Sequence, residues 1–402
     1  MTRLDPALQA QVDAQLMEQG GFAPLELLIN CGRLTYADYE SWRRGEIELL
    51  DDVLMGSAEK IRAQVEAVNA YARSIGLVEQ AQEFHTWQSG AAAKPLRVSA
   101  DGKLHRLIAT RFVPAQSVPQ MDLFFDNPVV ALTNGIAQAL SSRNAAEAQR
   151  LLDRLYAQAP NNTDLPAFDQ LLTALLSLNQ PATDAAQSLA FLQKIAPHAK
   201  RLLGTQSRDL LSPLWSRLAQ RLQDRPFSPD EPLLHRSHAL SQAQDWAGVS
   251  ECVRSDADWP RHAELCLRLA HSAFYRQQRI EALTAWCHLC WQHPAQAEQA
   301  LESKTQPDTG VTALWRRFLD SEDDIELNAA DFPAWLLLHE AGLVQHLPLE
   351  LAAGETRGEA QYRSVHRLLQ ARRAGRKDEE LSLRRELQTR HPALFGYLKR
   401  TM

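Results

Sequence analysis

A CxxC motif, Cys287 to Cys290 in the stretch EALTAWCHLCWQHP, is the most conspicuous candidate for chemistry. Such a pair can be half of a zinc or iron–sulfur site, with Cys266, His288 or His293 as further ligands. Zinc sites usually bring two such pairs together from turns, whereas helical periodicity places this pair in mid-helix and the sequence holds no second pair. A redox pair belongs at a helix N-terminus, where the helix dipole lowers the thiol pKa. The sequence therefore favours core packing, and we expect no metal or other cofactor.

The helix expected around this motif offers a reason to bury its second cysteine. Its inward stripe is predicted to contain Ala282, Trp286, Leu289 and Cys290. Free cysteine packs well as a small hydrophobic residue. Only Cys287 lacks a packing role in this interpretation.

Motifs for other chemistries are incomplete. His339-Glu340 resembles the start of a zinc-peptidase helix, but Leu343 stands where the second histidine is needed. The sequence has no Gly-rich phosphate loop and no GxSxG elbow. The acidic run at 320–324 lacks the ligand spacing of a calcium loop and is interpreted as a solvated loop. We therefore predict that the protein is not an enzyme.

Composition indicates a folded, soluble chain of bacterial type. The 402 residues are 45% hydrophobic and carry a formal charge of −6, which argues against disorder and against a general nucleic-acid coat. Five cysteines, an odd number, fit a reducing compartment. No apolar run is long enough for a membrane span, so we expect a cytoplasmic location.

Residues 1–90 are predicted to form an N-terminal helical module. One helix begins near Thr35, a capping residue, and a longer one begins at Ser57 and ends at Gly76. Residues 91–127 are interpreted as a connector. Asp101-Gly102 in this connector is a hairpin signal, although the flanking apolar residues fit a helix equally well.

From residue 128 to 402, paired helices are predicted to repeat, beginning after a capping Asn127 and a first-turn Pro128. A pattern of small, large, large and proline recurs at fixed offsets: Ala148, Leu152, Leu155, Pro160; Ala185, Leu189, Leu192, Pro197; and Ala282, Trp286, Leu289, Pro294. The prolines at 260 and 294 lie 34 residues apart, an interval typical of stacked helical pairs. Each proline is expected to end a helix.

These residues resemble the tetratricopeptide-repeat family, most closely over 261–294, where Leu269 and Ala270 also match the first helix of the repeat. A partial match covers 363–392, with Gly375 at the turn between helices. The resemblance implies a mainly α, divergent solenoid of helical hairpins. It also implies a partner-binding concave face lined by first helices, which would here present Glu264, Leu267, His271, Phe274 and Tyr275.

The last 48 residues are basic, with twelve Lys or Arg against six Asp or Glu from Glu355 onward. Repeat arrays need a charged outer cap, and this segment fits that role. A second interpretation, compatible with the first, is a surface for an anionic partner. It would use Arg363, Arg367, Arg372, Arg373 and Arg376.

Three functions follow, and the first is favoured. The protein is predicted to be a non-catalytic adaptor or assembly factor that holds a protein or peptide partner. The first alternative is a transcriptional regulator in which a helix, a turn containing Gly32 and the helix from Thr35 read DNA, with Arg43 and Arg44 touching phosphate. Its acid-rich surroundings make DNA an unfavoured partner. The other alternative is a metal-binding protein centred on Cys287 and Cys290.

Overall fold

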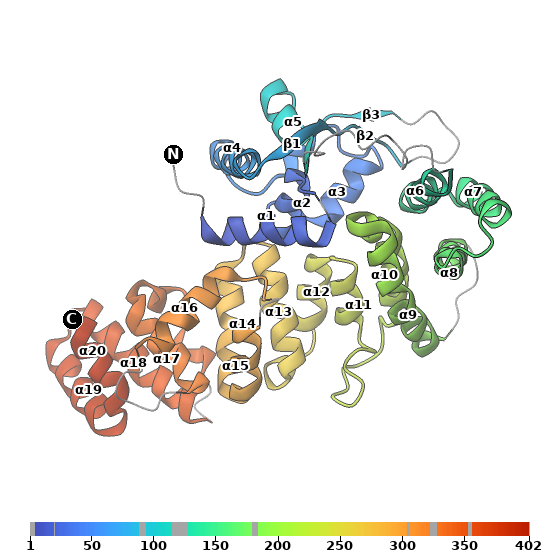
Figure 1. The fold of residues 1–402 in the computed structure, drawn as a ribbon. Coiled ribbons are helices and arrows are strands. Elements are labelled where there is room, and N and C mark those ends of the chain that lie inside the picture. The colour runs from blue at the N-terminus through green and yellow to red at the C-terminus, as the bar shows by residue number, and fades with distance from the viewer. Residues whose placement is uncertain are drawn as a thin grey trace. The chain divides into compact units, whose positions relative to one another are not determined.

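The computed structural model describes residues 5–19, 21–87, 94–114, 128–178, 184–303, 306–321, 328–352 and 356–401. The chain is mainly helical and divides into two compact units, Met1–Asp245 and Trp246–Met402 (Figure 1). The domain boundaries predicted at residues 90 and 127 stay predictions. The capping role expected of Asn127 and most of the acidic run at 320–324 lie outside the described residues.

The first unit contains helices and two small sheets. Its elements are α1 (Pro6–Gln19), α2 (Pro24–Asn30), α3 (Tyr36–Arg43), η1 (Leu50–Val53), α4 (Ala58–Ser74), β1 (Leu77–Ala81), β2 (Phe84–His85), β3 (Pro95–Leu96), α5 (Gly102–Ile108), β4 (Thr110–Pro114), α6 (Pro128–Ser141), α7 (Ala145–Gln158), α8 (Leu165–Ser177), α9 (Ala185–Leu203), η2 (Gly204–Gln206), α10 (Ser207–Arg221) and α11 (Arg236–Gln242). Among the described strands, β1 pairs antiparallel with β4 and β2 with β3.

The two N-terminal helix starts predicted from capping residues are confirmed. The Thr35 hydroxyl accepts a hydrogen bond from the Asp38 amide at 3.1 Å, and the Ser57 hydroxyl accepts one from the Lys60 amide at 3.4 Å. Each side chain satisfies an amide that the first helical turn leaves without a partner. The second of these helices, α4, ends before Gly76, which has a left-handed φ of 85°.

The hairpin interpretation of Asp101-Gly102 is wrong, and the helical alternative is correct. Asp101 caps α5, its carboxylate accepting a hydrogen bond from the Lys103 amide at 2.8 Å. Leu104 and Ile108 are then buried on one face of that helix, which an extended hairpin would not achieve. Packing of this apolar face therefore decided between two locally plausible structures.

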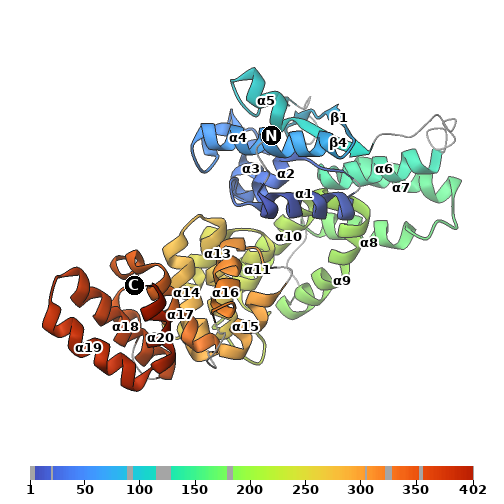
Figure 2. The same ribbon diagram turned by 60° about the vertical axis from the view of Figure 1, so that its left-hand side comes forward.

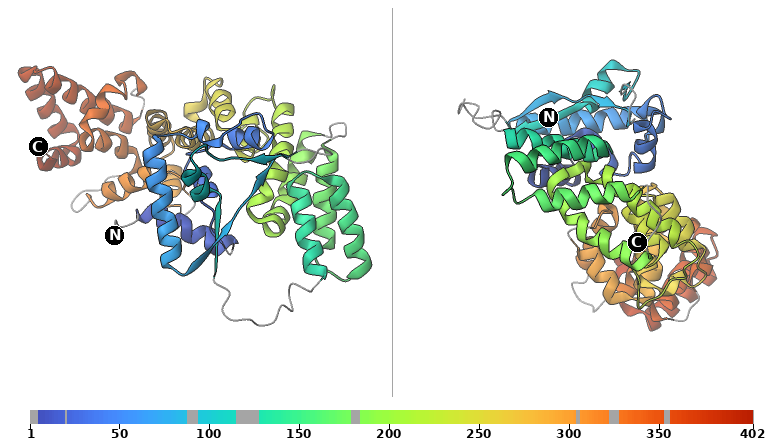
Figure 3. Two further views of the ribbon diagram at one scale, coloured as in Figure 1. Left: turned by 90° about the horizontal axis from the view of Figure 1, so that it is seen from above. Right: turned by 90° about the vertical axis from the view of Figure 1, so that its right-hand side faces the viewer.

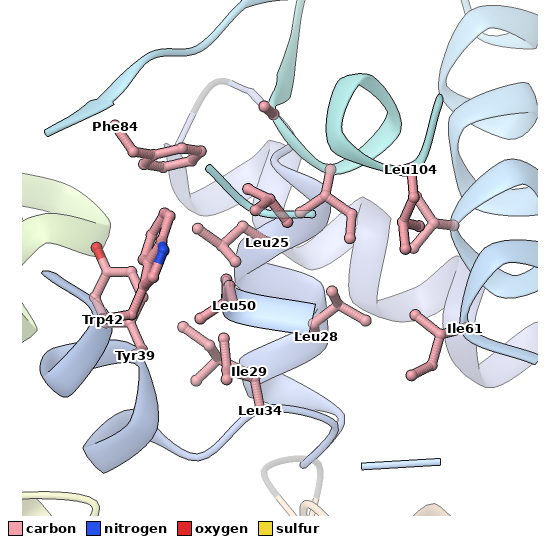
Figure 4. Close-up of a cluster of buried hydrophobic side chains, with 14 of the residues drawn as sticks. Leu25, Leu28, Ile29, Leu34, Tyr39, Trp42, Leu50, Ile61, Phe84 and Leu104 are labelled. Carbon is pink, nitrogen blue, oxygen red and sulfur yellow. The ribbon is translucent and has the colours of Figure 1, made fainter. Parts of the chain in front are cut away.

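One core of the first unit gathers side chains from α2, α3, α4 and α5 (Figure 4). Trp42 is fully buried there, and its indole nitrogen donates a hydrogen bond to the Arg97 carbonyl at 3.1 Å. The ring of Trp42 also meets that of Phe84 edge to face, with centroids 5.2 Å apart. The segment up to Pro114 thus shares its core with the N-terminal helices.

The later helices of the first unit pack as neighbouring pairs. α6 packs on α7, and α10 packs on α9 and α11; the turquoise and green ribbons of α6 and α7 lie side by side in Figure 3. α7 ends at Gln158, so the predicted stop at Pro160 is confirmed. The predicted stop at Pro197 is wrong, because this proline lies inside α9. The buried stripe of Ile195, Ala199 and Leu203 continues past it, and its packing outweighs the missing amide.

The second unit is helical throughout its described residues. Its elements are α12 (Trp246–Arg254), η3 (Trp259–Arg261), α13 (Ala263–Tyr275), α14 (Arg279–Gln292), α15 (Pro294–Glu302), α16 (Thr309–Leu319), η4 (Ala329–Asp331), α17 (Phe332–His339), η5 (Ala341–Gln345), η6 (Leu349–Leu351), α18 (Arg357–Arg373), α19 (Lys377–Arg390) and α20 (Pro392–Thr401). The helical pair predicted for 261–294 is confirmed as α13 and α14, which pack together. The stop predicted at Pro294 is confirmed as well, and α19, in the partial match over 363–392, ends at Arg390, before Pro392.

The tight turn that ends α2 at Gly32 and α3 at Gly45 recurs at the ends of α6, α11, α13 and α18. Each of these last four has a residue in the left-handed region: Arg143, Gln244, Gln277 and Gly375, with φ between 58° and 69°. The next amide donates to the carbonyl five residues back: Asn144 to Ala139 at 2.8 Å, Asp245 to Leu240 at 3.0 Å, Gln278 to Ala273 at 2.8 Å, and Arg376 to Ala371 at 2.9 Å. This is the Schellman pattern of a helix end. Three of those donors are also N-caps of the following helix, for example Arg376 before α19. Figure 2 shows α18 and α19, which this turn joins, lying side by side.

No helix among the described residues is both long enough and apolar enough to cross a membrane.

The recurring turn predicts opposite effects at two positions. Gly375→Ala should destabilise the second unit by about 1 kcal/mol, because an L side chain is strained in the left-handed region. Gln277→Gly should stabilise it by a similar amount, since it removes that strain. Urea unfolding of both variants measures the change. A shift of the same sign in both would contradict this account of the turn.

Candidate functional site

The thiols of the CxxC motif lie inside the second unit. Cys287 and Cys290, both on α14, are 2% and 0% exposed, and Cys266 on α13 is also fully buried. Burial raises the pKa of Cys266 to about 12 and raises those of Cys287 and Cys290 well above the usual thiol range. All three are therefore protonated at neutral pH and act as small apolar groups.

The burial of Cys287 was not foreseen from the sequence. α14 packs on α13, and also on α17 and α18, so residues outside its predicted inward stripe are covered as well. Leu283 and Trp291, for example, are both 3% exposed. A helix that is apolar around its whole circumference is typically buried, and this signal is present in LTAWCHLCW.

A metal at the CxxC motif has no ligand set among the described residues, where no three His, Cys, Asp or Glu side chains are grouped for coordination. The intervening His288 packs edge to face against Trp259 and Trp291, with centroids 5.0 and 5.5 Å apart. Burial lowers the pKa of His288 to about 4. This imidazole is neutral at pH 7 and is held by ring contacts.

A cleft of about 350 Å³ opens in the second unit where the α13–α14 turn faces the start of α16. Its lining combines apolar and charged side chains. The lining residues are Phe274, Gln277, Gln278, Arg279, Ala282, Leu283, Asp308, Gly310, Val311, Ala313, Leu314, Arg317 and Glu340. The apolar part includes Leu283 and Val311, which are almost fully buried, and the half-buried Phe274.

The charged part of the cleft is held in place by ion pairing and capping. The Arg279 guanidinium donates two hydrogen bonds to Glu340, at 2.8 and 2.6 Å from its two carboxylate oxygens. Asp308 caps α16 by accepting a hydrogen bond from the Val311 amide at 3.0 Å, and burial raises the pKa of its carboxyl. Arg317 is exposed at the same lining. The cleft thus offers an apolar floor with fixed charges around it.

The structure brings only one residue of the predicted concave face, Phe274, into this cleft. Tyr275 instead stacks on Trp246, with ring centroids 4.2 Å apart. Leu267 and His271 are half-buried, and burial lowers the pKa of His271 to about 4. Glu264 is exposed and pairs with Arg268 at 3.6 Å.

The other cleft residues were not singled out from the sequence. Arg279 and Glu340 lie 61 positions apart in the sequence, and no local sequence pattern predicts that they form an ion pair. Asp308 had a weak signal, because an Asp before a short helical segment is a common cap.

The five arginines of the predicted anionic-partner surface lie on α18 and at the start of α19. Arg367, Arg372 and Arg373 are exposed, and Arg363 is half-buried. Arg376 pairs with Glu379 at 2.7 Å. The first turn of α19 also carries Asp378 and Glu380, so positive and negative side chains alternate on this surface. Such mixing is expected of an outer cap.

The helix that would read DNA, α3, is packed within the first unit. The Tyr36 hydroxyl donates to Asp209 on α10 at 2.9 Å, and Arg143 pairs with Glu40 at 2.6 Å. Arg43 donates to the His85 carbonyl at 3.1 Å, while Arg44 pairs with Glu46 at 2.8 Å. Arg43 is half-buried, whereas Arg44 is exposed and its charge is balanced by the exposed Glu46. These contacts hold α3 against the rest of the first unit and leave it without a strongly basic face, which weighs against the regulator alternative.

Comparison of the chain with family models, with curated proteins and with solved structures gives no match. Packed helical pairs are a property of the fold, and no family is identified.

The buried thiols predict a clear labelling pattern. In the native protein, iodoacetamide should leave Cys287 and Cys290 unmodified, because both are covered and protonated. Half-buried Cys252 on α12 is the control that should react first. Peptide mass mapping in buffer and in urea measures the modified fraction at each site. Rapid native alkylation of either CxxC thiol, or a native mass carrying a bound metal ion, would contradict the packing role.

The buried carboxyl of Asp209 predicts a pH effect on stability. Burial raises its pKa from 3.8 to about 6, although Arg43 and the Tyr36 hydroxyl oppose the shift. The folded state therefore holds this proton more tightly than the unfolded state. The protonated carboxyl of Asp209 therefore stabilises the folded state below pH 4, and this stabilisation is lost as the pH rises to about 6. The free energy of unfolding falls by roughly 3 kcal/mol over this range.

Asp209→Asn keeps an oxygen acceptor for Tyr36 and removes the titration. Urea unfolding at pH 4 and pH 7 should show that the wild type loses more free energy of unfolding over this range than the variant does. Parallel pH profiles for the two proteins would show that Asp209 does not titrate in this window.

Proposed function

We propose that the protein is a non-catalytic adaptor or assembly factor, and that it holds a segment of a protein partner in the cleft beside the α13–α14 turn. The observation that carries this proposal is the combination of an apolar floor with fixed charges in one open cleft. A cavity of about 350 Å³ accommodates one or two large side chains, and charges around it orient the segment that supplies them.

The polar groups of the cleft support binding over catalysis. Its described lining contains two carboxylates, Asp308 and Glu340, and no Ser, Cys, His, Lys or Tyr side chain. One carboxylate caps a helix and the other is held by Arg279. An acyl- or phosphoryl-transfer site needs a nucleophile within reach of a base, and this lining does not supply that pair.

A divergent tetratricopeptide-like arrangement is part of the same proposal. Its support is the spacing of two of the recurring turns. The left-handed residues Gln244 and Gln277 lie 33 positions apart, close to the 34-residue interval between Pro260 and Pro294. Solenoids of such helical pairs bind partners on an extended concave surface, and Phe274 is the residue of that predicted face that also lines the cleft.

Truncating Phe274 tests the proposal. Phe274→Ala should lower recovery of the bound partner at least about tenfold in affinity purification from the native cell, because buried aromatic side chains anchor interfaces. Phe395→Ala is the matched control, since Phe395 is a half-buried phenylalanine of the same unit outside the cleft. Quantitative mass spectrometry compares the proteins recovered with each variant.

Thermal unfolding of both variants establishes that they are equally folded. Equal recovery of every partner by the wild type and Phe274→Ala would contradict the proposal. Loss of a partner from Phe395→Ala alone would place the binding surface elsewhere.

A further inference from the structure

A second cavity, of about 300 Å³, lies in the first unit between α8, α9 and α10. Its floor includes Leu192, Leu214 and Leu218, which are between 1% and 7% exposed. Half-buried Phe191 also contributes to the wall. Leu176, one helical turn after Thr173 in this wall, is 43% exposed and extends the apolar surface along α8.

Two arginines on α10 give this groove its charge. The Arg217 guanidinium donates a hydrogen bond to the Ser177 carbonyl at the end of α8, and Arg221 donates to the Ser188 hydroxyl of α9 at 3.0 Å. The described residues that line the groove include no acidic side chain. The described part of the lining therefore has a net charge of +2, in a protein whose net charge is −6.

The spacing of these arginines indicates the geometry of the complementary group. They stand four positions apart on one helix, so their side chains project from the same face about one turn apart. A partner helix with carboxylates at positions i and i+4 presents the same spacing. Apolar residues on the adjoining face of that helix would enter the cavity between the two arginines and α9.

We propose that this groove, defined by Phe191, Leu214, Arg217 and Arg221, binds an acidic amphipathic helix of a protein partner. Leucine-sized side chains fill the cavity, and two carboxylates one turn apart meet the two guanidinium groups. Paired charges of this kind select the partner and its register, while the apolar contacts hold it. This groove shares no lining residue with the cleft in the second unit, so the two proposals can be tested separately.

Fluorescence anisotropy with the full chain tests the groove directly. The probe is a labelled helical peptide with two leucines on one face and two glutamates four residues apart beside them. Its control has glutamine in place of both glutamates. The wild type should bind the glutamate peptide at least about tenfold more tightly, and added salt should reduce that preference.

The variants locate the binding. Arg217→Gln/Arg221→Gln should abolish the preference for glutamate, whereas Arg217→Lys/Arg221→Lys should retain part of it. Lys194→Gln/Lys200→Gln removes the same amount of charge from exposed positions of α9 outside the groove, and should leave the preference unchanged. Phe191→Ala should weaken binding of both peptides and leaves the arginines intact.

Several results would overturn the proposal. One is equal binding of the two peptides, or no binding, by the wild type. Another is a lysine-to-glutamine control that loses the preference for the glutamate peptide as completely as the arginine-to-glutamine variant does. That result would indicate nonspecific charge attraction. If thermal unfolding shows that the arginine-to-glutamine variant is not folded, the Phe191→Ala variant provides the test. Unchanged peptide binding by Phe191→Ala would then rule out the groove as the binding site.

Discussion

The structure depends on a backbone constraint at the ends of its helices. Where the amide of Gln278 bonds to the Ala273 carbonyl, the intervening Gln277 is forced into the left-handed region and the next helix begins at once. Two helices joined so closely must lie against each other, so each hides an apolar stripe on its neighbour. The same constraint places Arg279 and Phe274 on either side of the turn, at one end of the cleft.

The packing that follows from these turns places the thiols of the CxxC motif in the interior of the second unit. α14 is covered by α13 and by α17 and α18, so its cysteines, tryptophans and leucines all become interior side chains. A thiolate is stabilised by solvent, by a nearby cation or by a metal. Burial removes the solvent, and desolvation is the main cause of the raised pKa of both CxxC thiols. The two cysteines, a residue type that can bind metals or react as a nucleophile, are therefore part of the packed core.

The sequence could predict those features that depend on neighbouring residues. The caps at Thr35 and Ser57 and the helical pair 261–294 were all foreseeable, because capping groups and apolar spacing act locally. Local signals failed where packing overrode them. Pro197 stays inside a helix because its neighbours have a buried face to cover, and Asp101-Gly102 opens a helix for the same reason.

The candidate site was less predictable, because its polar groups are distant in sequence. Arg279 meets Glu340 across 61 positions, and Tyr36 meets Asp209 across 173. Such pairs are fixed by the path of the whole chain. Only Phe274 was identified in advance, from its place on the first helix of the best repeat unit. The turns at Arg143, Gln244 and Gln277 could not be predicted either, because these residues stand where glycine is the usual signal.

Hydrogen–deuterium exchange of the full chain, alone and with the partner recovered from the native cell, tests the central claim most directly. The account predicts slower amide exchange in the partner's presence at 274–283 and 308–317, the two segments that contribute most of the cleft lining. Exchange in α18 and α19 should stay unchanged. Protection confined to α18 and α19, with none at the cleft, would contradict the account.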